Sequence, residues 1–528
     1  MNIRKLPIGT QSFEKLRSNG CVYVDKTALV WELANTLPMA FLSRPRRFGK
    51  SLLVSTLEAY FSGRRELFKG LAIEKLENDW DVHPVIRIDF SIRDYGLSEN
   101  FDSAVDEILS QNEQACRMKR QTGSPSSRLK RLIEEYHRIS GKTVVILVDE
   151  YDKPMLDALY SDHEEANREK LRDFYSPLKA CYEHLRFVFL TGITKISHVN
   201  IFSGLNQLKD ISLSDKYSSV CGITGAEVAR YFALEIQALS DKYSISLDTT
   251  LEKLRDMYDG YHFSAHSDGV YNPFCLLCAF EDLKFGSYWM SSGTPSALIR
   301  RLQNDVIKAN RLIQEGCEVD EMFFADYDSN SPDISPLLYQ AGYLTIIGYK
   351  PLLETYRLGF PNREVAEGLM RHLLSKYLDA VSTDYGATIE HLRKALAGGD
   401  AKGVSDIVTS CVSGIPTIMR ENCENYYESL VHILFRATGY EVVGQAQSSA
   451  GRADIVLQVP ECVWIFELKM DGGAKDAESV CDVALGQIDA NGYAKPYLTS
   501  GKTIRKVALV FSSDKKGLVA WKESCARS

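Results

Sequence analysis

A chain of 528 residues is long enough for about three domains and a large buried core, which excludes a single small binding module. Hydrophobic residues make up 45% of the chain and charged residues 25%, which is the mixture of a folded globular protein and not of a disordered or fibrous one. The formal net charge is -8, so a polyanion has to bind a local positive patch instead of the surface as a whole.

The cysteines and the apolar runs predict a cytoplasmic protein. The twelve cysteines are scattered along the chain, as is typical of buried thiols in a reducing compartment. Residues 1–7 lack the apolar core of a secretion signal, and the longest apolar runs, such as residues 144–148, are too short to span a membrane. We therefore expect a cytoplasmic location and no membrane partner.

About the first two hundred residues alternate short β-branched runs with longer polar helical patterns, which predicts a parallel sheet between helices. Ligands of such sheets bind beyond the carboxyl ends of the strands, so a site is expected there. The aromatic-rich turns further along, at 258–263 and 271–273, carry no catalytic constellation. The expected strands cover residues 39–43, 85–90, 144–148, 187–190 and 209–213.

The first of these strands leads into the sequence Arg-Pro-Arg-Arg-Phe-Gly-Lys-Ser at residues 44–51, followed by a helical pattern. The second half matches the phosphate-binding pattern G-x-x-x-x-G-K-[ST], whereas Arg44 stands where the first glycine belongs. Gly49 and the helix N-terminus offer backbone N–H groups to phosphates, Lys50 reaches the β- and γ-phosphates, and Ser51 offers a hydroxyl to Mg²⁺. We expect ATP and Mg²⁺ to bind here, and an arginine-rich surface turn is the competing interpretation.

Two carboxylates follow the strand at 144–148. Asp149 is placed to hold Mg²⁺ through water, and Glu150 is placed to polarise the attacking water. The next strand, 187–190, ends in Thr191, whose hydroxyl either faces the γ-phosphate or serves only as a cap, and Thr194 is the alternative. The predicted nucleotide-binding residues are therefore Arg46, Arg47, Phe48, Gly49, Lys50, Ser51, Leu52, Asp149 and Thr191, with Ser51 and Asp149 as metal ligands and Glu150 as a catalytic residue.

The loop carries three arginines, Arg44, Arg46 and Arg47. They either clamp the phosphates or act on a neighbouring subunit as arginine fingers. The sequence does not choose between these roles, and it leaves the oligomeric state open.

A second constellation lies in two strand patterns, 453–459 and 462–469, which are separated by only two residues. A two-residue hairpin loop pairs residue 459 with 462 and therefore places Asp454 directly opposite Glu467. Both carboxylates then share one face of the hairpin, and the other face, which carries Trp464, is expected to be the core. Two carboxylates about 5 Å apart repel each other unless a cation or a shared proton lies between them. A divalent metal is the economical explanation.

Lys469 shares the face of Glu467 and is placed to polarise a scissile phosphate or to position the attacking water. A D...E-x-K arrangement of this kind performs metal-dependent phosphodiester cleavage with Mg²⁺. Upstream, Glu428 lies on the apolar stripe of an amphipathic helix and is a candidate for an additional acidic ligand. We predict Glu428, Asp454 and Glu467 as metal ligands and Asp454, Glu467 and Lys469 as catalytic residues. A surface hairpin with a simple ion pair is the competing interpretation.

Three segments, 23–27 (Tyr-Val-Asp-Lys-Thr), 44–51 and 148–154 (Val-Asp-Glu-Tyr-Asp-Lys-Pro), carry a resemblance to a known family. They are similar to bacterial AAA-ATPase-like proteins, which usually have a C-terminal PD-(D/E)XK nuclease-like domain, and the resemblance spans nearly the whole chain. The loop of that family also reads R-P-R-R-F-G-K-[ST], so the missing first glycine matches it. Gln487 and Tyr493 resemble the Q-x(5)-Y element of several PD-(D/E)XK families, which implies that they orient the site or touch the substrate backbone.

Together these features predict an α/β protein with three parts. Residues 1–220 form a P-loop NTPase domain with helices on both faces of a parallel sheet, 221–400 a mainly helical middle domain, and 401–528 an α/β restriction-endonuclease-like domain. The expected function is ATP binding and hydrolysis coupled through the middle domain to Mg²⁺-dependent cleavage of nucleic acid, with DNA as the expected substrate and RNA left open. The alternative is a nucleotide-gated switch that binds nucleic acid or a protein partner without cutting.

Overall fold

The contacts of the chain divide it into two compact units. Unit 1 comprises residues 1–292 and 318–364, and unit 2 comprises residues 293–317 and 365–528. The three domains expected from the sequence stay a prediction. The computed structural model describes residues 5–96, 99–159, 161–195, 201–202, 205–290, 302, 306–325, 331, 333–378, 385–413, 423–448, 451–472, 476–512, 514 and 517–526.

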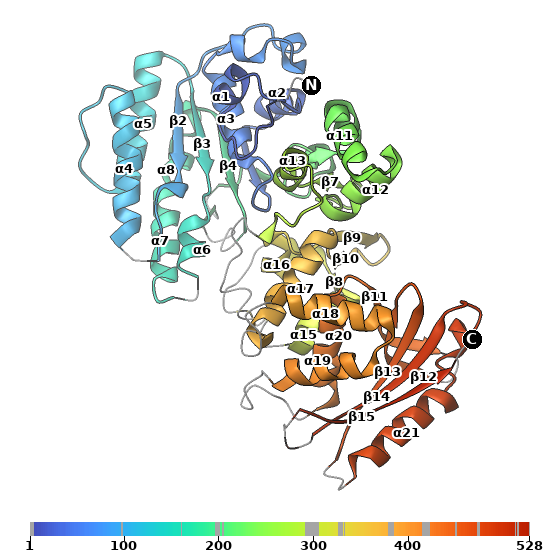
Figure 1. The fold of residues 1–528 in the computed structure, drawn as a ribbon. Coiled ribbons are helices and arrows are strands. Elements are labelled where there is room, and N and C mark those ends of the chain that lie inside the picture. The colour runs from blue at the N-terminus through green and yellow to red at the C-terminus, as the bar shows by residue number, and fades with distance from the viewer. Residues whose placement is uncertain are drawn as a thin grey trace. The chain divides into compact units, whose positions relative to one another are not determined.

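Unit 1 is built on a five-stranded parallel sheet in the order β2-β3-β4-β1-β5 (Figure 1). All residues of β1 and β3 are buried, as expected of strands whose sheet is covered on both faces. Each of the five strands expected from the sequence overlaps an observed strand, so that prediction is confirmed. The strands are β1 (Met39–Ser43), β2 (Val85–Asp89), β3 (Val144–Asp149), β4 (Leu185–Gly192) and β5 (Leu208–Asp210).

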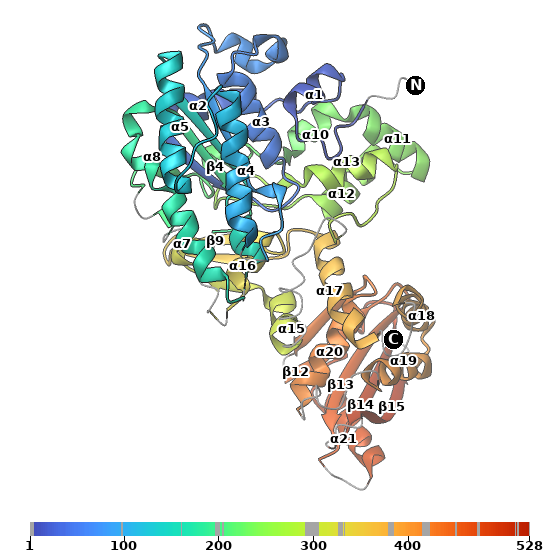
Figure 2. The ribbon, with the colours of Figure 1, turned by 90° about the vertical axis from the view of Figure 1, so that its left-hand side faces the viewer.

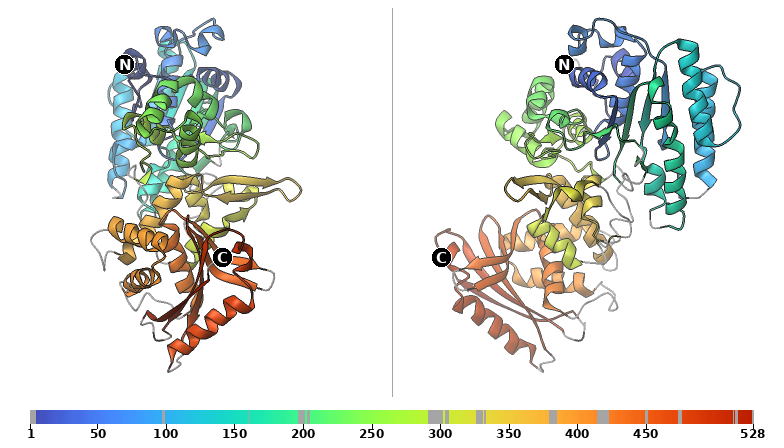
Figure 3. Two further views of the ribbon diagram at one scale, coloured as in Figure 1. Left: turned by 45° about the vertical axis from the view of Figure 1, so that its right-hand side comes forward. Right: turned by 180° about the vertical axis from the view of Figure 1, so that it is seen from behind.

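Helices cover both faces of this sheet, with α1, α2 and α3 on one face and α4 and α5 on the other (Figures 1 and 3). Their ends follow local signals in the sequence. In α5, Ser124 caps the N-terminus, Pro125 takes the first helical position, and Gly141 ends the helix with a φ of 64°. The helices are α1 (Phe13–Ser18), α2 (Thr27–Thr36), α3 (Lys50–Phe61), α4 (Glu99–Ala115), α5 (Pro125–Ser140), α6 (Lys153–Asp157), α7 (Glu164–Tyr175) and α8 (Pro177–Ala180).

The strand order decides which side chains meet at the edge of the sheet. β4 lies between β1 and β3 and pairs in parallel with both. Because all five strands run in the same direction, the loop after β1, the carboxylates after β3 and the end of β4 emerge at one edge. The motifs found in the sequence are therefore brought together, although about a hundred residues separate the first two.

The rest of unit 1 is mainly helical and includes two small sheets, β6-β7 and β8-β10-β9. The aromatic turn between α12 and β7 packs beside the loop after β1 and is described with the site below. The elements are β6 (Ile223–Thr224), α10 (Gly225–Tyr231), α11 (Ala233–Tyr243), α12 (Leu247–Tyr258), β7 (Val270–Tyr271), α13 (Pro273–Glu281), β8 (Cys317–Val319), α16 (Ser335–Ala341), β9 (Thr345–Lys350) and β10 (Thr355–Gly359).

Gly260, in this aromatic turn, is expected to tolerate no side chain. Its φ is 89°, and a Cβ at this position would lie 2.0 Å from the carbonyl oxygen of Pro361. We expect Gly260→Ala to lower the free energy of unfolding by about 2–4 kcal/mol, since positive-φ strain and a backbone clash add. Gly225→Ala, whose Cβ meets nothing within 4 Å, is the matched control. Urea denaturation followed by circular dichroism measures both variants, and equal stabilities would contradict the prediction.

Unit 2 is built on a mixed five-stranded sheet in the order β11-β12-β13-β14-β15, in which only β13 and β14 pair in parallel. α21 connects these two strands and covers one face, while α19 and α20 lie on the other (Figures 1 and 2). None of the described helices is both long enough and apolar enough to cross a membrane. The elements are α15 (Val306–Glu315), α17 (Arg363–Leu378), α18 (Tyr385–Gly398), α19 (Ala401–Ser413), α20 (Glu424–Arg436), β11 (Glu441–Ser448), β12 (Gly451–Gln458), β13 (Cys462–Met470), α21 (Ala477–Ala490), β14 (Thr503–Phe511) and β15 (Leu518–Ala526).

Both faces of the β12–β13 hairpin belong to the core, whereas the sequence predicted a core on one face only. Trp464 donates a hydrogen bond to the backbone of α18 and Phe466 packs on α20, as expected of the predicted core face. On the opposite face, Val463 and Ile465 are buried with Ile488 of α21. The prediction was incomplete because α21 returns across this face and covers its apolar positions. Only the end of the hairpin carries the polar groups.

Candidate functional sites

The loop after β1 brings Lys50 to the carboxyl edge of the sheet in unit 1. Gly49 has a φ of 89° and directly precedes α3, so this turn requires the left-handed conformation that glycine adopts readily. The ammonium of Lys50 donates hydrogen bonds to the carbonyl oxygens of Arg44 and Pro45, both at 2.9 Å. A lysine has three N–H donors, so one remains for a phosphate. Burial lowers the pKa of Lys50, while nearby carboxylates oppose that shift.

Arg44 explains why the loop needs no glycine at its first position. Its φ is not positive, so an L-residue fits there without strain. The guanidinium donates hydrogen bonds to the carbonyl oxygens of Ser43 and Ser212 at 2.9 and 2.7 Å and lies 4.0 Å over the ring of Phe263. Because Arg44 is 1% exposed, its side chain fits neither a phosphate clamp nor an arginine finger.

Phe48 packs the same loop against the aromatic turn at 258–263, and Arg47 packs it against α13. Phe48 is buried and packs edge-on against Tyr261 and Phe263, with ring centroids 4.8 and 5.3 Å apart. The guanidinium of Arg47 is exposed and lies 4.7 Å from the centre of the Phe274 ring. The aromatic turn at 258–263, to which the sequence gave no role, therefore helps α13 to hold the loop after β1 in place.

Asp149 and Ser51 form the candidate magnesium site of unit 1. Asp149 is buried, and a side-chain hydrogen bond joins it to Ser51. Burial raises the pKa of Asp149, and the charge of Asp89, its register partner on β2, raises it further. Hydroxyl and carboxylate oxygens are ligands that Mg²⁺ prefers, so the residues present fit this ion. Asp89 was not identified from the sequence, although it lies within the predicted strand 85–90 and ends β2 at the same edge.

Glu150, the residue after Asp149, has a strained backbone conformation. Its φ is 52°, which is uncommon for a residue with a long side chain and is a feature of active sites. Burial raises the pKa of Glu150, and the charge of Lys50 opposes the shift. A carboxylate in this position can accept a proton from a water molecule beside the phosphates.

The threonine at the end of β4, Thr191, and the one just after it, Thr194, are hydrogen-bonded within the fold. The Thr191 hydroxyl donates to the carbonyl oxygen of Leu42 at 2.8 Å, and the Thr194 hydroxyl donates to Asp152 at 2.7 Å. Asp152 also accepts backbone N–H groups of Ile193 and Thr194, so it ties the end of β4 to the acidic segment. The sequence assigned no role to Asp152, although it lies three residues after Asp149. The role of Thr191 at the γ-phosphate stays a prediction.

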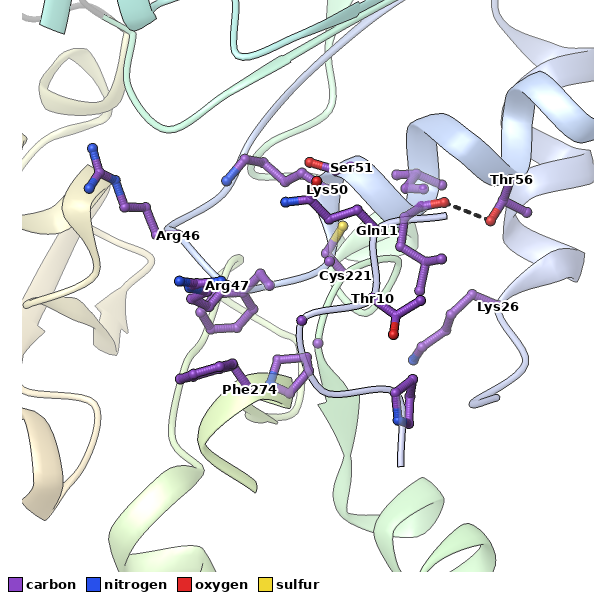
Figure 4. Close-up of a pocket in the computed structure, with 18 of the residues that line it drawn as sticks. Thr10, Gln11, Lys26, Arg46, Arg47, Lys50, Ser51, Thr56, Cys221 and Phe274 are labelled. Carbon is purple, nitrogen blue, oxygen red and sulfur yellow. Dashed lines mark hydrogen bonds between the residues drawn. The ribbon is translucent and has the colours of Figure 1, made fainter. Parts of the chain in front are cut away.

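A cavity of about 460 Å³ lies at this edge of the sheet (Figure 4). This volume falls within the range of about 300–1,000 Å³ that is typical of small-molecule sites. Asp149 and Thr191 are buried and are not part of its wall. The predicted residues that line it are Arg46, Arg47, Phe48, Gly49, Lys50, Ser51, Leu52 and Glu150.

In unit 2, the β12–β13 hairpin has the register that the sequence predicted. Ile455 pairs with Phe466, and the backbone N–H of Val459 donates to the carbonyl oxygen of Cys462 at 2.9 Å. The observed pairing extends to Ile455 and Phe466, and one further step in the same register would place Asp454 opposite Glu467. The pairing of the two carboxylates therefore follows from the length of the hairpin loop alone.

Asp454, Glu467 and Lys469 form an acidic cluster with one cation. Asp454 accepts the backbone N–H of Leu468 at 2.7 Å. The ammonium of Lys469 donates to Oε1 of Glu467 at 3.0 Å and lies 3.5 Å from Oε1 of Glu424. The other carboxylate oxygen of Glu467, Oε2, is buried and has no hydrogen-bond partner among the described residues.

The raised pKa values of the carboxyl groups in this cluster indicate a shortage of compensating positive charge. Burial raises the pKa of Glu467 to about 7, and the charge of Asp454 adds to the shift. Burial also raises the pKa of Asp454. A divalent cation relieves such crowding of carboxylates, so Asp454 and Glu467 fit Mg²⁺. Within the described ranges, however, no three His, Cys, Asp or Glu side chains are gathered closely enough to hold a metal ion.

Glu428 of α20 lies near this cluster but is held by another partner. Its Oε1 accepts a hydrogen bond from the side-chain amide of Gln445 at 2.7 Å. Burial raises the pKa of Glu428 to about 7, and the charge of Asp454 contributes. Glu424, one turn earlier on the same helix, is the acid that reaches Lys469. The sequence missed Glu424, although its four-residue spacing from Glu428 is a signal that both face the same side.

Gln487 is half-buried on α21, and its role stays a prediction. Ala484, one turn earlier, is buried in one cluster with Ala508, the strand partner of Glu467. This part of α21 therefore passes beside the end of the sheet that carries the acidic cluster. Tyr493 is buried in a core cluster with Val463 and Ile465 of β13.

The raised pKa of Glu467 predicts a pH-dependent stability in metal-free protein. The unfolded chain releases the proton of this group near pH 4.5, whereas the folded protein keeps it up to about pH 7, so unfolding becomes easier as pH rises between these values. At about 1.4 kcal/mol per pKa unit, Glu467→Gln should be more stable than the wild type at pH 8 by about 3 kcal/mol. Denaturant unfolding at pH 5 and 8 measures this, with exposed Glu478→Gln as control. If the difference in stability between Glu467→Gln and the wild type were the same at pH 5 and at pH 8, the prediction would be contradicted.

Comparison with known proteins assigns a family description to two parts of the chain. A family model described as "Predicted AAA-ATPase" matches residues 7–202, and one described as "PD-(D/E)XK nuclease superfamily" matches residues 422–521. The "Uncharacterized protein in vnfD 5'region" of Azotobacter chroococcum mcd 1 is 35% identical over 540 residues, which cover 99% of this chain and 99% of that protein. The chain belongs to this bacterial AAA-ATPase-like family. It therefore combines an AAA-ATPase-like domain with a C-terminal domain of the PD-(D/E)XK nuclease superfamily.

Solved structures give weaker similarities to this AAA-ATPase-like protein. The Walker-type ATPase paby2304 of Pyrococcus abyssi aligns with 14% identity and a TM-score of 0.36, covering 70% of this chain and 99% of that chain. Drosophila ORC bound to GC-rich DNA and Cdc6 aligns with 12% identity and a TM-score of 0.23, covering 82% of this chain and 62% of that chain. Neither similarity is strong enough to assign a function.

Proposed function

We propose that this protein binds and hydrolyses ATP and that its nucleotide state controls Mg²⁺-dependent cleavage of nucleic acid by the C-terminal domain. The observation that carries the proposal is that each unit places buried carboxylates beside one lysine at the end of a sheet. In unit 1 these are Asp149 and Lys50, and in unit 2 they are Glu467 and Lys469. Phosphate chemistry needs this combination, because a metal held by the acids and an ammonium together neutralise the reacting phosphate.

In the ATPase domain, Lys50 would contact the β- and γ-phosphates with its remaining N–H while the loop carbonyls hold its ammonium in place. Ser51 and Asp149 would hold Mg²⁺, which supplies charge neutralisation when bound. Glu150 would orient the attacking water and accept its proton, since burial raises the pKa of this carboxyl and so makes it a stronger base. Arg46 and Arg47 remain candidates for phosphate contacts.

In the nuclease-like domain, Asp454 and Glu467 would hold Mg²⁺, which activates water and neutralises charge on the phosphate. The buried, unpartnered Oε2 of Glu467 supports this assignment. Lys469 would position the attacking water or stabilise the phosphorane-like transition state, and Gln487 would orient the site. Glu428 would join as a third acid by exchanging its hydrogen bond to Gln445 for the ion.

The coupling between the two activities would begin at the phosphate loop. Phe48 packs on the aromatic turn after α12 and Arg47 packs on α13, so a movement of the loop on ATP binding would shift the helical middle of the chain. DNA is the proposed substrate, and RNA serves as the comparison. The proposed location is the cytoplasm.

The direct test incubates the full chain with plasmid DNA, single-stranded DNA and RNA. Each reaction is run with and without ATP and with Mg²⁺, Mn²⁺ or EDTA, and phosphate release and strand cleavage are measured in the same samples. We expect phosphate release that requires Mg²⁺ and cleavage that requires the metal and responds to ATP. Phosphate release without cleavage of any substrate would refute the nuclease half of the proposal.

A nucleotide-gated switch that does not cut is the second candidate. Two contacts favour it: Glu428 accepts a hydrogen bond from Gln445, and Glu424 lies near Lys469. Of the four described acids around this site, only Asp454 and Glu467 then remain to hold the ion. Isothermal titration calorimetry with Mn²⁺ separates the two candidates. Binding that disappears in both Asp454→Asn and Glu467→Gln supports the nuclease, and no such binding supports the switch.

A further inference from the structure

The cavity in unit 1 extends beyond the part that the phosphates of a nucleotide would occupy. Beyond Lys50 and Ser51 it continues between the segment that precedes α1 and the helices α11 and α13. An apolar wall with a few polar groups is typical of sites that bind the organic part of a ligand. The apolar residues at this end are Pro7, Val24, Val30, Phe232, Pro273 and Leu277.

The polar side chains that line this end of the cavity include Lys26, Thr10 and Gln11, and the first of these has a partner in the fold. Lys26 donates to both carboxylate oxygens of Glu227, at 2.7 and 2.6 Å, so its charge is neutralised. The hydroxyl of Thr10 and the side-chain amide of Gln11 have no hydrogen-bond partner among the described residues. Figure 4 shows Gln11 between Lys50 and Thr10 in its view. A nucleotide whose phosphates contact Lys50 therefore brings its nucleoside part against Gln11 and Thr10.

The position of Gln11 is fixed relative to the phosphate loop. Two residues later, the backbone N–H of Phe13 donates to the hydroxyl of Ser55 on α3 at 3.0 Å. Phe13 is fully buried and its ring lies 5.3 Å from that of Tyr23. Ser55 lies one turn after Ser51 on the same helix, so the segment that carries Gln11 is fastened to the helix whose N-terminus faces the phosphates.

A side-chain amide distinguishes the two purines by its hydrogen bonds. It offers one donor and one acceptor side by side, which complements the N6 amino group and N7 of adenine. Guanine presents two acceptors, O6 and N7, at the same edge, so the amide oxygen would face another oxygen. Of the free side chains at this end, only Gln11 offers this pattern.

We propose that this end of the cavity binds the base of a purine nucleotide and that Gln11 selects adenine over guanine. The inference rests on the proposed binding of a nucleoside triphosphate at Lys50. A good pair of amide–base hydrogen bonds gives a discrimination of about 5- to 150-fold. The wild-type protein is therefore expected to prefer ATP to GTP within this range.

The test measures equilibrium binding of ATP, GTP and inorganic tripolyphosphate to the full chain in the presence of Mg²⁺. Gln11→Ala should weaken ATP binding about 5- to 150-fold, leave tripolyphosphate binding unchanged and remove the preference over GTP. Gln11→Glu, which keeps the size but replaces the donor by an acceptor, should weaken ATP binding while still disfavouring GTP, because guanine offers no donor at this edge. Gln111→Ala, at an exposed position of α4 outside the cavity wall, is the matched control and should behave like the wild type.

The negative results of this test distinguish an error in the role of Gln11 from an error in the proposed nucleotide site. Wild-type affinity of Gln11→Ala for ATP, or an equal loss of ATP and tripolyphosphate binding, would overturn the assignment of Gln11. The proposed nucleotide site would still stand in that case, provided that Lys50→Ala weakens binding of all three ligands. If the wild type binds none of the three, the nucleotide site itself is refuted and this inference with it.

Discussion

Lys50→Ala is expected to reduce ATP hydrolysis at least a hundredfold, because it removes a preorganised cation from the phosphates. The carbonyl oxygens of Arg44 and Pro45 fix the position of the Lys50 ammonium. Neither a water molecule nor a neighbouring side chain can replace this positive charge and keep both hydrogen bonds. The same change also leaves Asp149 and Glu150 without their nearest cation, which should further raise the pKa values of both carboxyl groups. Phosphate release and calorimetric titration with ATP measure the effect.

The control for this variant is Lys142→Ala. Lys142 forms a half-exposed ion pair with Asp81 at 3.0 Å in the same unit and does not line the cavity. Its removal should leave hydrolysis and ATP affinity unchanged. Circular dichroism of Lys50→Ala checks that the fold is retained. A folded Lys50→Ala protein with wild-type phosphate release would show that the ATPase site has been misplaced.

The sheet of unit 1 and the hairpin of unit 2 were predictable because local rules fix them. Apolar β-branched runs bounded by polar residues mark strands in a buried parallel sheet, and each of the five was found. The two-residue loop between β12 and β13 fixed the register, and the register in turn set Asp454 opposite Glu467. In both cases the information lies within a few neighbouring residues.

The residues that the sequence missed depend on contacts between distant segments. Asp89 is a candidate site residue because β2 lies beside β3 and brings it next to Asp149. Glu424 is one because α20 brings it within reach of Lys469. The burial of Arg44 likewise depends on Ser212, far along the chain. Strand order and helix docking decide these contacts, and no local pattern around the residues encodes them. The same limitation explains why one face of the β12–β13 hairpin was expected to be more open than it is.

Asp454→Asn is expected to reduce metal-dependent cleavage about a thousandfold while ATP hydrolysis is retained. The substitution keeps an acceptor for the backbone N–H of Leu468 and so preserves the hairpin, but it removes the charge that helps to hold the ion. A metal contributes several kcal/mol to phosphodiester cleavage, and each 1.36 kcal/mol corresponds to a factor of about ten. Since burial raises the pKa of Asp454, removing the charge should not weaken the fold, and thermal unfolding of metal-free protein should show an equal or higher midpoint. Asp482→Asn, an exposed position on α21, is the matched control for cleavage, and an Asp454→Asn protein that still cuts at the control's rate would exclude this carboxylate from the reaction.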